Sequence, residues 1–251
     1  MTKLLVSIIT PSYNSAVTIR DTLESIAQQN YKNIEHIIID GHSTDDTLKI
    51  VSEFPHVNRM ISAKDQGIYH AMNKGLSLAS GDIIGILNSD DLYIDQQVLA
   101  TVAKVFEDET VDGCYADLQY VSPSELNKVS RTWKSGKFTA RSFYWGWMPP
   151  HPTVFLRRRV YDAVGNFNQS LRSAADYEFL LRVFLKNNFK FEYIPKTLVK
   201  MRTGGMSNAS LRNRFRANRE DHLAWELNDL KPYFFTLYLK PFRKIFQFLI
   251  K

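Results

Sequence analysis

Two adjacent carboxylates, Asp90 and Asp91, end a stretch that is apolar from Ile83 to Leu87. A short apolar run bounded by turn residues predicts a buried strand, which would place the pair at the strand's carboxyl end, where open α/β sheets bind ligands. Two carboxylates about 4 Å apart repel each other by roughly 4 kcal/mol at an effective dielectric of ~20. A hard divalent cation with oxygen ligands relieves such repulsion. The local sequence equally allows an Asp-rich turn that caps the next helix.

The elements that precede this pair alternate between apolar runs and amphipathic segments. We expect buried strands at 3–10, 34–39, 59–62 and 83–87, with a helix at 68–79 before the last of them. Pro11 is expected to end the first strand, and Ser15 to cap a helix with Val17 on its apolar side. This order predicts an α/β fold, a mostly parallel sheet with helices on both faces.

The second half of the chain is less regular. We expect strands at 113–117, 119–121, 154–156, 189–194 and 198–201, and helices at 96–106 and 174–184. Residues 122–151 predict a long irregular segment of the kind that is usually functional or mobile. The sequence therefore divides into a domain at 1–208, with halves 1–121 and 122–208, and a helical C-terminal extension at 209–251.

Size and composition limit the class of protein. With 251 residues and 44% apolar content, the chain can form one large domain, or one domain plus an appendage. The single cysteine, Cys114, excludes a disulfide framework. The first residues lack the pattern of a signal peptide, and no apolar run approaches the ~18 residues of a spanning helix. We therefore expect a cytoplasmic protein.

The positive charge is concentrated at the C-terminal end. The formal net charge is +6, yet residues 1–199 hold 21 Lys/Arg and 22 Asp/Glu, while residues 200–251 hold 11 and 4. This distribution argues against a nucleic-acid binder and for one anionic contact surface. From Leu239 onward, basic residues fall on one arc of a helical wheel opposite bulky apolar ones, which predicts contact of 233–251 with an anionic membrane. Packing on the domain or on a partner subunit is the alternative.

Six ordered motifs carry a resemblance to the family 2 glycosyltransferases. They are Val6–Asn14, Ile39–Asp45, Asp65–Gly75, Gly81-Asp82, Asn88–Asp91 and Ala175–Arg182. The resemblance covers nearly the whole chain and implies a GT-A fold and transfer of a sugar from a nucleotide diphosphate donor, here a UDP-sugar. The chain looks most similar to bacterial enzymes of exopolysaccharide, capsule or O-antigen synthesis, such as the colanic acid transferases.

The donor site implied by the resemblance lies at the strand ends. Asp40 corresponds to a position that reads the N3–H of uracil in the family, and the alternative is a turn aspartate. Thr10, Pro11, Tyr13 and Asn14 could line the same edge, although Tyr13 could also be a core aromatic. Asp65 and Lys74 flank the third helix, where Lys74 could offset phosphate charge or remain a solvated charge.

The Asn88–Asp91 motif departs from the family pattern. Members commonly have Asp-x-Asp-Asp, with contacts to the ribose and to Mn²⁺ or Mg²⁺, whereas this chain has Asn88 in the first place. We expect Asp91 to bind the metal directly and Asp90 to contact the ribose or support the metal. The cation would neutralise charge on the departing diphosphate.

Asp176 is the candidate general base. An inverting transfer needs a carboxylate to take the proton of the acceptor hydroxyl, and such a base typically contributes 10²–10⁴-fold. The alternative is that Asp176 only caps its helix. Glu178 is expected to be a surface charge paired with Arg182 at i+4.

The residues proposed to face the acceptor or the diphosphate are less well defined by pattern. His151 occupies a position that related sequences often fill with histidine, and a structural histidine is the alternative. Trp145 and Trp147 could stack on sugar rings or pack in the core. Arg202 and Ser207 belong to a Gly-containing loop that could close over the diphosphate.

The expected function is thus an inverting, metal-dependent hexosyl- or N-acetylhexosaminyltransferase. Its acceptor would be a lipid-linked saccharide of cell-surface polysaccharide synthesis, met at the inner face of the cytoplasmic membrane. Two alternatives remain open, a nucleotidyltransferase and a non-catalytic nucleotide-sugar binder or scaffold. The first turn lacks G-x-G-x-x-G, which disfavours a dinucleotide-binding oxidoreductase.

Overall fold

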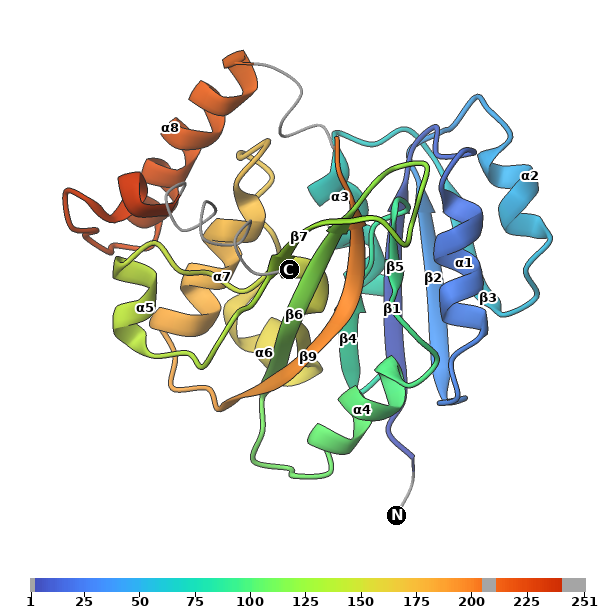
Figure 1. Cartoon of the computed structure of the whole chain (residues 1–251), viewed down its shortest axis with the longest axis horizontal. Coiled ribbons are helices and arrows are strands. Elements are labelled where there is room, and N and C mark those ends of the chain that lie inside the picture. The colour runs from blue at the N-terminus through green and yellow to red at the C-terminus, as the bar shows by residue number, and fades with distance from the viewer. Residues whose placement is uncertain (1–2, 205–210, 241–251) are drawn as a thin grey trace.

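One nine-stranded sheet runs through the molecule, and helices lie on both of its faces (Figure 1). The structure, a computed structural model, describes residues 3–204 and 211–240, without the side chains of 211–215. The strands are β1 (Val6–Ser12), β2 (Ile34–Asp40), β3 (Val57–Ser62), β4 (Ile83–Ile86), β5 (Asp91–Tyr93), β6 (Gly113–Val121), β7 (Val129–Trp133), β8 (Phe155–Arg157) and β9 (Phe191–Arg202). The helices are α1 (Ile19–Ala27), α2 (Thr47–Ser52), α3 (Ile68–Leu78), α4 (Val98–Val105), α5 (Ala140–Tyr144), α6 (Arg158–Val164), α7 (Ala175–Leu185) and α8 (Leu211–Leu227), with a 3₁₀ turn at His151–Thr153.

The strand order is β3-β2-β1-β4-β8-β6-β9-β5, and β7 pairs with β6. Strands β1 to β4 are parallel to one another, as are β6 and β9. Strands β5, β7 and β8 run antiparallel to their partners. The expected α/β fold is confirmed, and the carboxyl ends of the parallel strands meet at one edge.

The parallel strands are apolar on both faces, as buried strands require. In β1, Ile9 packs toward α3, while its neighbours Val6 and Ile8 pack into the cluster that contains α4. In β2, Ile38 packs against α1 and α2. Because neighbouring side chains point to opposite faces, each apolar run contributes to a core on either side of the sheet.

Pro11 does not end the first strand, because β1 continues to Ser12 with Pro11 opposite Ile39. The hydrogen-bond pattern of the sheet explains this. The Ile9 carbonyl accepts the Leu87 amide from the β4 side, so the backbone N–H and C=O groups of every second residue face β4, and Pro11 is one of these residues. Pairing with β4 ends at Ile9, and the missing N–H of Pro11 therefore leaves no ladder bond unmade. The expected apolar role of Val17 is wrong, since its side chain is 95% exposed just before α1 begins.

The irregular segment expected at 122–151 contains β7 and α5, and β5 and α6 were also not anticipated. The two strands expected at 189–201 form one long strand, β9, whose pairing with β6 is irregular near Asp117. These elements are short or depend on a distant partner strand. Their local sequence therefore carries little periodic signal.

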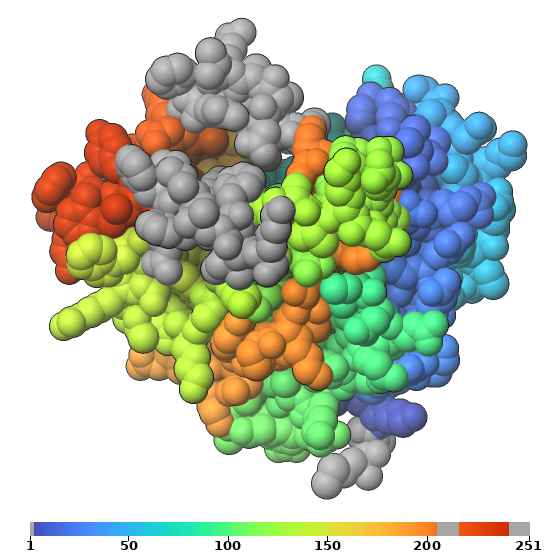
Figure 2. Space-filling model, in the orientation of Figure 1, coloured from blue at the N-terminus to red at the C-terminus, as the bar shows by residue number. Residues whose placement is uncertain are grey.

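Helix α8 is built into the same core as α7. Ala224 and Trp225 are fully buried, and the Trp225 indole N–H donates to the Tyr177 hydroxyl at 2.9 Å. The segment after α8 packs on α5, where the Thr236 hydroxyl donates to the Tyr144 carbonyl. Figure 2 shows α8 and the residues after it against the α5 region, on one side of the molecule. In the described part of the chain, no helix has the length and apolarity needed to cross a membrane.

Candidate active site

The loops after β1 and β2 are tied together at the carboxyl edge of the sheet. Asn14 has a positive φ of 47°, a conformation that asparagine tolerates better than most residues. From there its side-chain oxygen accepts the Thr44 amide at 2.9 Å, and its own amide donates to the Ser43 hydroxyl at 2.8 Å. Tyr13, the neighbouring residue, is 63% exposed. The edge therefore presents one open aromatic ring on a rigid turn.

Asp40 is fully buried, and its carboxylate joins three strand ends. One oxygen accepts the hydroxyls of Ser12 and Ser43, and the other accepts the Ser43 amide at 2.8 Å and the Ser62 hydroxyl at 2.7 Å. These four bonds fill the ordinary acceptor capacity of a carboxylate. In this structure Asp40 therefore organises the edge, and the reading of a base by Asp40 stays a prediction.

Asp65 lies in a more open position at the same edge. A methyl group added at Gly41 would come within 2.9 Å of an Asp65 carboxylate oxygen and 3.3 Å of the Tyr13 ring. Gly41 thus keeps a narrow space between the aromatic ring and the carboxylate. The other Asp65 oxygen accepts the Gly67 amide that precedes α3. Lys74 lies further along α3, with its ammonium 3.5 Å from the Lys64 carbonyl.

Thr10 does not line this space, because its hydroxyl faces inward to the ring of His36 at 3.1 Å. Thr10 is fully buried, and Pro11 beside it is also a buried residue. The loop after β1 therefore contributes Tyr13 and Asn14 to the open edge, while Thr10 and Pro11 in the strand belong to its support.

The Asn88–Asp91 turn lies beside these loops and is anchored from several sides. The Ser89 hydroxyl is 2.8 Å from that of Ser15, a residue 74 positions earlier. On α1, the Thr22 hydroxyl donates to the Asp91 carbonyl at 2.6 Å. From β9, Arg202 donates to the Asp90 carbonyl at 2.6 Å. The backbone of the carboxylate turn is therefore held before any ligand binds.

Arg202 brings a positive charge close to the carboxylate pair. The Arg202 residue is 6% exposed, and its guanidinium forms an ion pair with Asp21 of α1. In this structure the Arg202 guanidinium is directed to Asp21 and to the Asp90 carbonyl, and the expectation that it faces the diphosphate stays a prediction. Burial raises the pKa of Asp90, and Arg202 partly opposes that rise. Burial and the Asp90 charge raise the pKa of Asp91 well above its usual range.

Two side-chain oxygens at this turn are buried without a hydrogen-bond partner. They are Oδ1 of Asn88 and Oδ1 of Asp91. The second oxygen of Asp91 accepts the Asn88 side-chain amide at 3.0 Å. Buried oxygens are nearly always paired, so these two indicate a partner that the chain itself does not supply, such as a cation or a water. Uncharged and charged oxygen donors suit Mg²⁺ or Mn²⁺, so the residues present fit such an ion.

The protein alone supplies few ligands for that ion. Within residues 3–204 and 211–240, no three His, Cys, Asp or Glu side chains form a metal-binding group. Asp91 is 1% exposed and Asp90 is more open, so the two carboxylates differ in their access to solvent. A metal held here would need further oxygens from a bound ligand or from water.

Asp176 lies in the first turn of α7, where the expected helix begins. The Tyr69 hydroxyl on α3 donates to its Oδ1 at 3.1 Å. Tyr69 lies in the first turn of α3, four residues after Asp65, so the start of α3 links the donor edge to the candidate base. Burial and the charge of Asp176 raise the pKa of Tyr69 well above its usual range, so the phenol remains protonated. Sequence reasoning missed Tyr69, although it stands inside the Asp65–Gly75 motif.

His151 begins the 3₁₀ turn beside this pair. Its ring packs edge-on against Phe167 at 5.5 Å. Burial lowers the pKa of His151, and the charge of Asp176 opposes this in part. A neutral imidazole near Asp176 can donate one hydrogen bond and accept another. The structure thus brings together Asp176, Tyr69 and His151 from three separate segments.

The two tryptophans proposed for the acceptor differ in position. Trp147 is 4% exposed, its indole N–H donates to the Ser135 carbonyl at 2.6 Å, and its ring packs among core aromatics. Stacking of Trp147 on a sugar is therefore wrong, and the core-packing alternative holds. Trp145 is half-exposed and lies 5.1 Å from the Phe235 ring, on the C-terminal side of the molecule. Ser207 lies outside the described residues.

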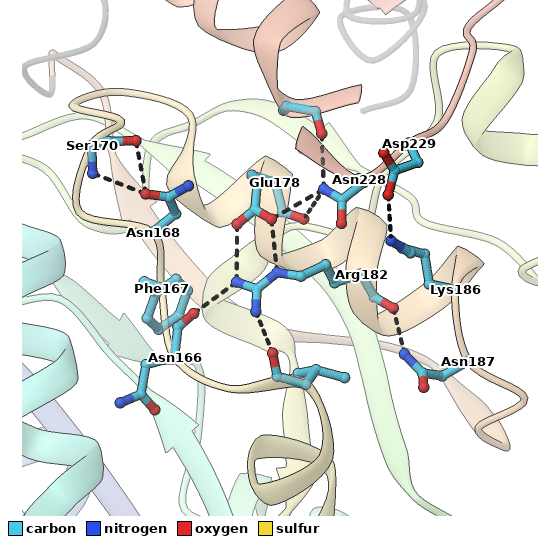
Figure 3. A network of polar contacts seen from close by, with 12 residues as sticks. Asn166, Phe167, Asn168, Ser170, Glu178, Arg182, Lys186, Asn187, Asn228 and Asp229 are labelled. Atoms are coloured by element: carbon cyan, nitrogen blue, oxygen red, sulfur yellow. Dashed lines mark hydrogen bonds and ion pairs between the residues drawn. The ribbon is translucent and has the colours of Figure 1, made fainter. Parts of the chain in front are cut away.

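Glu178 is not a surface charge, although its predicted pairing with Arg182 is confirmed at 2.7 Å (Figure 3). The Glu178 carboxylate is buried and also accepts the side-chain amide of Asn228, from the end of α8, at 3.0 Å. Arg182 further donates to the Val164 and Asn166 carbonyls. This network holds α7 between the α6 loop and α8.

Comparison with known proteins agrees with this fold. The family model described as Glycosyl transferase family 2 matches residues 7–165. A PGL/p-HBAD biosynthesis glycosyltransferase of Mycobacterium tuberculosis is 32% identical over 215 residues, which cover 83% of this chain and 81% of the relative. The chondroitin synthase of Pasteurella multocida is 28% identical over 214 residues, which cover 83% of this chain and 22% of that enzyme.

Solved structures share the fold at lower identity. S. aureus TarS 1-349 in complex with UDP-GlcNAc has a TM-score of 0.71 and 22% identity, covering 88% of this chain and 66% of that one. The chain spans 39% of a longer S. aureus TarS structure. The mannosyltransferase PcManGT from Pyrobaculum calidifontis, in complex with GDP-Man and Mn²⁺, has a TM-score of 0.67 and 20% identity, covering 96% and 70%.

Proposed function

The chain belongs to glycosyl transferase family 2, and we propose that it transfers a hexosyl or N-acetylhexosaminyl group from a UDP-sugar with inversion at the anomeric carbon. The observation that carries this proposal is the pair of unpartnered buried oxygens of Asn88 and Asp91 at the carboxyl edge of the sheet. They lie on a turn that is already fixed to α1 and β9, so binding a cation and a diphosphate there requires little rearrangement.

The donor would lie along the edge formed by the loops after β1 and β2. The Tyr13 ring and the Asp65 carboxylate border the space kept open by Gly41, which suits a flat base with an N–H donor. That a structural relative was solved with UDP-GlcNAc supports a uridine donor. Asp40 then positions the loop that borders the base. It can also accept the N–H of the base directly if one of its serine hydroxyls turns away.

The metal is proposed from the donor atoms of the turn. Asn88 and Asp91 would hold Mn²⁺ or Mg²⁺ through their unpartnered oxygens, with Asp90 toward the ribose or the ion. The bound ion would offset the negative charge that develops on the leaving diphosphate. The presence of Mn²⁺ in the structural relative with GDP-Man supports this. Lys74 adds a positive charge further along α3.

Asp176 acts as the general base in this proposal. Its Oδ1 is held by the Tyr69 hydroxyl, which leaves the second oxygen to receive the proton of the acceptor hydroxyl. The acceptor oxygen attacks the anomeric carbon as the bond to the diphosphate breaks, and one such displacement inverts the configuration. His151, neutral because burial lowers its pKa, can orient the acceptor by a hydrogen bond.

The acceptor is proposed to be a saccharide linked to a lipid, met at the inner face of the cytoplasmic membrane. Several large apolar side chains are exposed on the C-terminal side: Trp145, Leu227, Tyr233, Phe234 and Tyr238. Phe234 is 88% exposed, and the chain that follows carries the basic residues of the tail. Exposed aromatics beside basic residues are typical of an interface with anionic lipid. The part of this prediction at 241–251 lies outside the described residues.

Binding of the donor is tested by thermal stabilisation. UDP-sugars should raise the melting temperature in the presence of Mn²⁺ and less in EDTA, because a ligand of the folded state stabilises it by mass action. No shift with any UDP-sugar, with or without metal, would exclude this donor class. The Asp176→Asn variant should bind UDP and lose transfer, whereas a pure binder would be unaffected by that change.

Membrane contact is tested with vesicles. The protein should sediment with vesicles that contain phosphatidylserine and remain in solution with phosphatidylcholine alone. Phe234→Ala should weaken this binding without loss of folding, because the side chain contributes little to the core. Unchanged binding after removal of residues 233–251 would contradict a role for the tail.

A further inference from the structure

Helix α7, which carries Asp176, begins without a capping side chain of its own. Its N-cap residue is Ala174, whose side chain cannot form a hydrogen bond, and the turn before it is bonded to another helix instead. Oε2 of Glu220, in α8, accepts the backbone amides of Ser173 at 2.7 Å and Ala174 at 3.1 Å. These contacts join residues 46 and 47 positions apart.

The Glu220 carboxylate stabilises the start of α7 from a distant part of the same chain. The first amides of a helix have no partner within the helix, and its N-terminal end carries a partial positive charge. Glu220 accepts the amide of the N-cap residue, Ala174, and that of Ser173 before it, and such charge-assisted bonds are stronger than neutral ones. Glu220 therefore holds the entry to α7 two residues before Asp176.

The position of Asp176 is fixed from two directions. Tyr69 holds Oδ1 of the carboxylate from the donor side, and its ring stacks on Phe167 at 5.9 Å. Glu220 holds the backbone turn from the C-terminal side. Helix α8 is itself anchored to α7 by the bond from Trp225 to Tyr177. A shift of about 1 Å in a catalytic group can reduce a rate about 100-fold, so such support matters for the reaction.

We propose that Glu220 is a positioning residue for the general base, and that α8 is for this reason part of the catalytic apparatus. The proposal rests on the assignment of Asp176 as the base. Glu220 lies outside the segment matched by the family model, so the support is a property of this chain's C-terminal part.

The test compares Glu220→Ala, Glu220→Gln and Glu226→Ala. Glu226 is exposed on the same helix and serves as the matched control. Glu220→Ala should lower kcat at least tenfold with KM for the donor within about twofold, because the donor edge is unaffected. Glu220→Gln should recover most of the activity, since its amide oxygen can accept the same two amides. Equal kcat values for Glu220→Ala and Glu226→Ala would overturn the proposal, as would a Gln variant no better than Ala.

A second measurement does not depend on turnover. Hydrogen exchange of the peptide that covers 173–178 should accelerate in Glu220→Ala and remain unchanged in Glu226→Ala. Unchanged exchange would show that Glu220 does not hold the turn. If exchange accelerates while Asp176→Asn remains active, the assignment of the base is wrong and the support by Glu220 stands. Melting curves of each variant give its folded fraction at the assay temperature, and the loss of activity should exceed the loss of folded protein.

Discussion

Replacement of Arg182 by leucine should destabilise the protein far more than the same change at Arg20. Both arginines pair with a glutamate at nearly the same distance, 2.7 Å for Arg182 with Glu178 and 2.6 Å for Arg20 with Glu53. The side chains of Arg20 and Glu53 are 45% and 46% exposed, whereas those of Arg182 and Glu178 are 20% and 4% exposed. The two variants therefore separate the effect of burial from that of the ion-pair distance.

The magnitude follows from what each change leaves behind. Arg20→Leu leaves an exposed glutamate in water, and exposed pairs are worth about 0.2–1 kcal/mol. Arg182→Leu leaves the Glu178 carboxylate buried without a cation, which costs about 3–5 kcal/mol when a buried pair is broken. The Asn228 amide still donates to Glu178, so we expect about 3 kcal/mol. For a chain of this size that corresponds to a fall in Tm of roughly 6–12 °C.

Urea unfolding of both variants measures the two free energies directly. The double variant Glu178→Gln with Arg182→Leu is the decisive control. It removes the orphaned charge, and it should be more stable than Arg182→Leu alone. Similar costs for Arg20→Leu and Arg182→Leu, or a double variant less stable than the single one, would refute the assignment of the cost to a buried unpaired carboxylate.

Three further variants test the site and its support. Asn88→Asp adds a negative charge beside the buried Asp91 carboxylate, so it should lower the melting temperature in EDTA. The same charge should lower the Mn²⁺ concentration needed to stabilise the protein. An unchanged Mn²⁺ titration would argue against a cation at this turn. Burial lowers the pKa of His36 to about 3, so the folded state resists protonation that the unfolded state accepts, and stability should fall by about 1.4 kcal/mol per pH unit below about pH 6.5. Urea unfolding at pH 7 and pH 5 measures this loss of stability, which should be smaller in His36→Gln than in the unaltered protein. An equal loss of unfolding free energy in the two proteins would contradict the role of His36. Gly75→Ala should cost about 1–3 kcal/mol, because the new methyl carbon would lie 2.3 Å from Ile9; a neutral change would mean that α3 moves away from β1 easily.

The local pattern predicted the N-terminal half of the fold well. Apolar runs that end on Asp40 and Leu87 lie in parallel strands, and their carboxyl ends do meet at one edge. The ordered motifs also placed Asp176 at the start of a helix. These features depend on residues near one another in the chain, since the hydrophobic period and turn residues specify the element type.

Distant contacts decided the rest. Pro11 remains in its strand because the neighbouring strand is shorter, and Glu178 is buried because α8 returns over α7. Trp147, for which the sequence allowed either a sugar contact or core packing, is enclosed by aromatics from several other elements. The hydrophobic periodicity of one segment does not specify which distant helix or strand will pack on it.

By itself, the sequence determined the parallel strands, the edge at which their ends meet, and the residue types gathered there, because hydrophobic period and turn chemistry act over a few residues. Only the tertiary structure decided which polar groups remain unpaired. Asp40 and Asp91 look alike in the sequence, but the first is satisfied by serines from three segments and the second retains a buried oxygen without a partner. Pairing depends on atoms brought together from distant positions, so the distinction between a structural carboxylate and a candidate ligand arises only on folding.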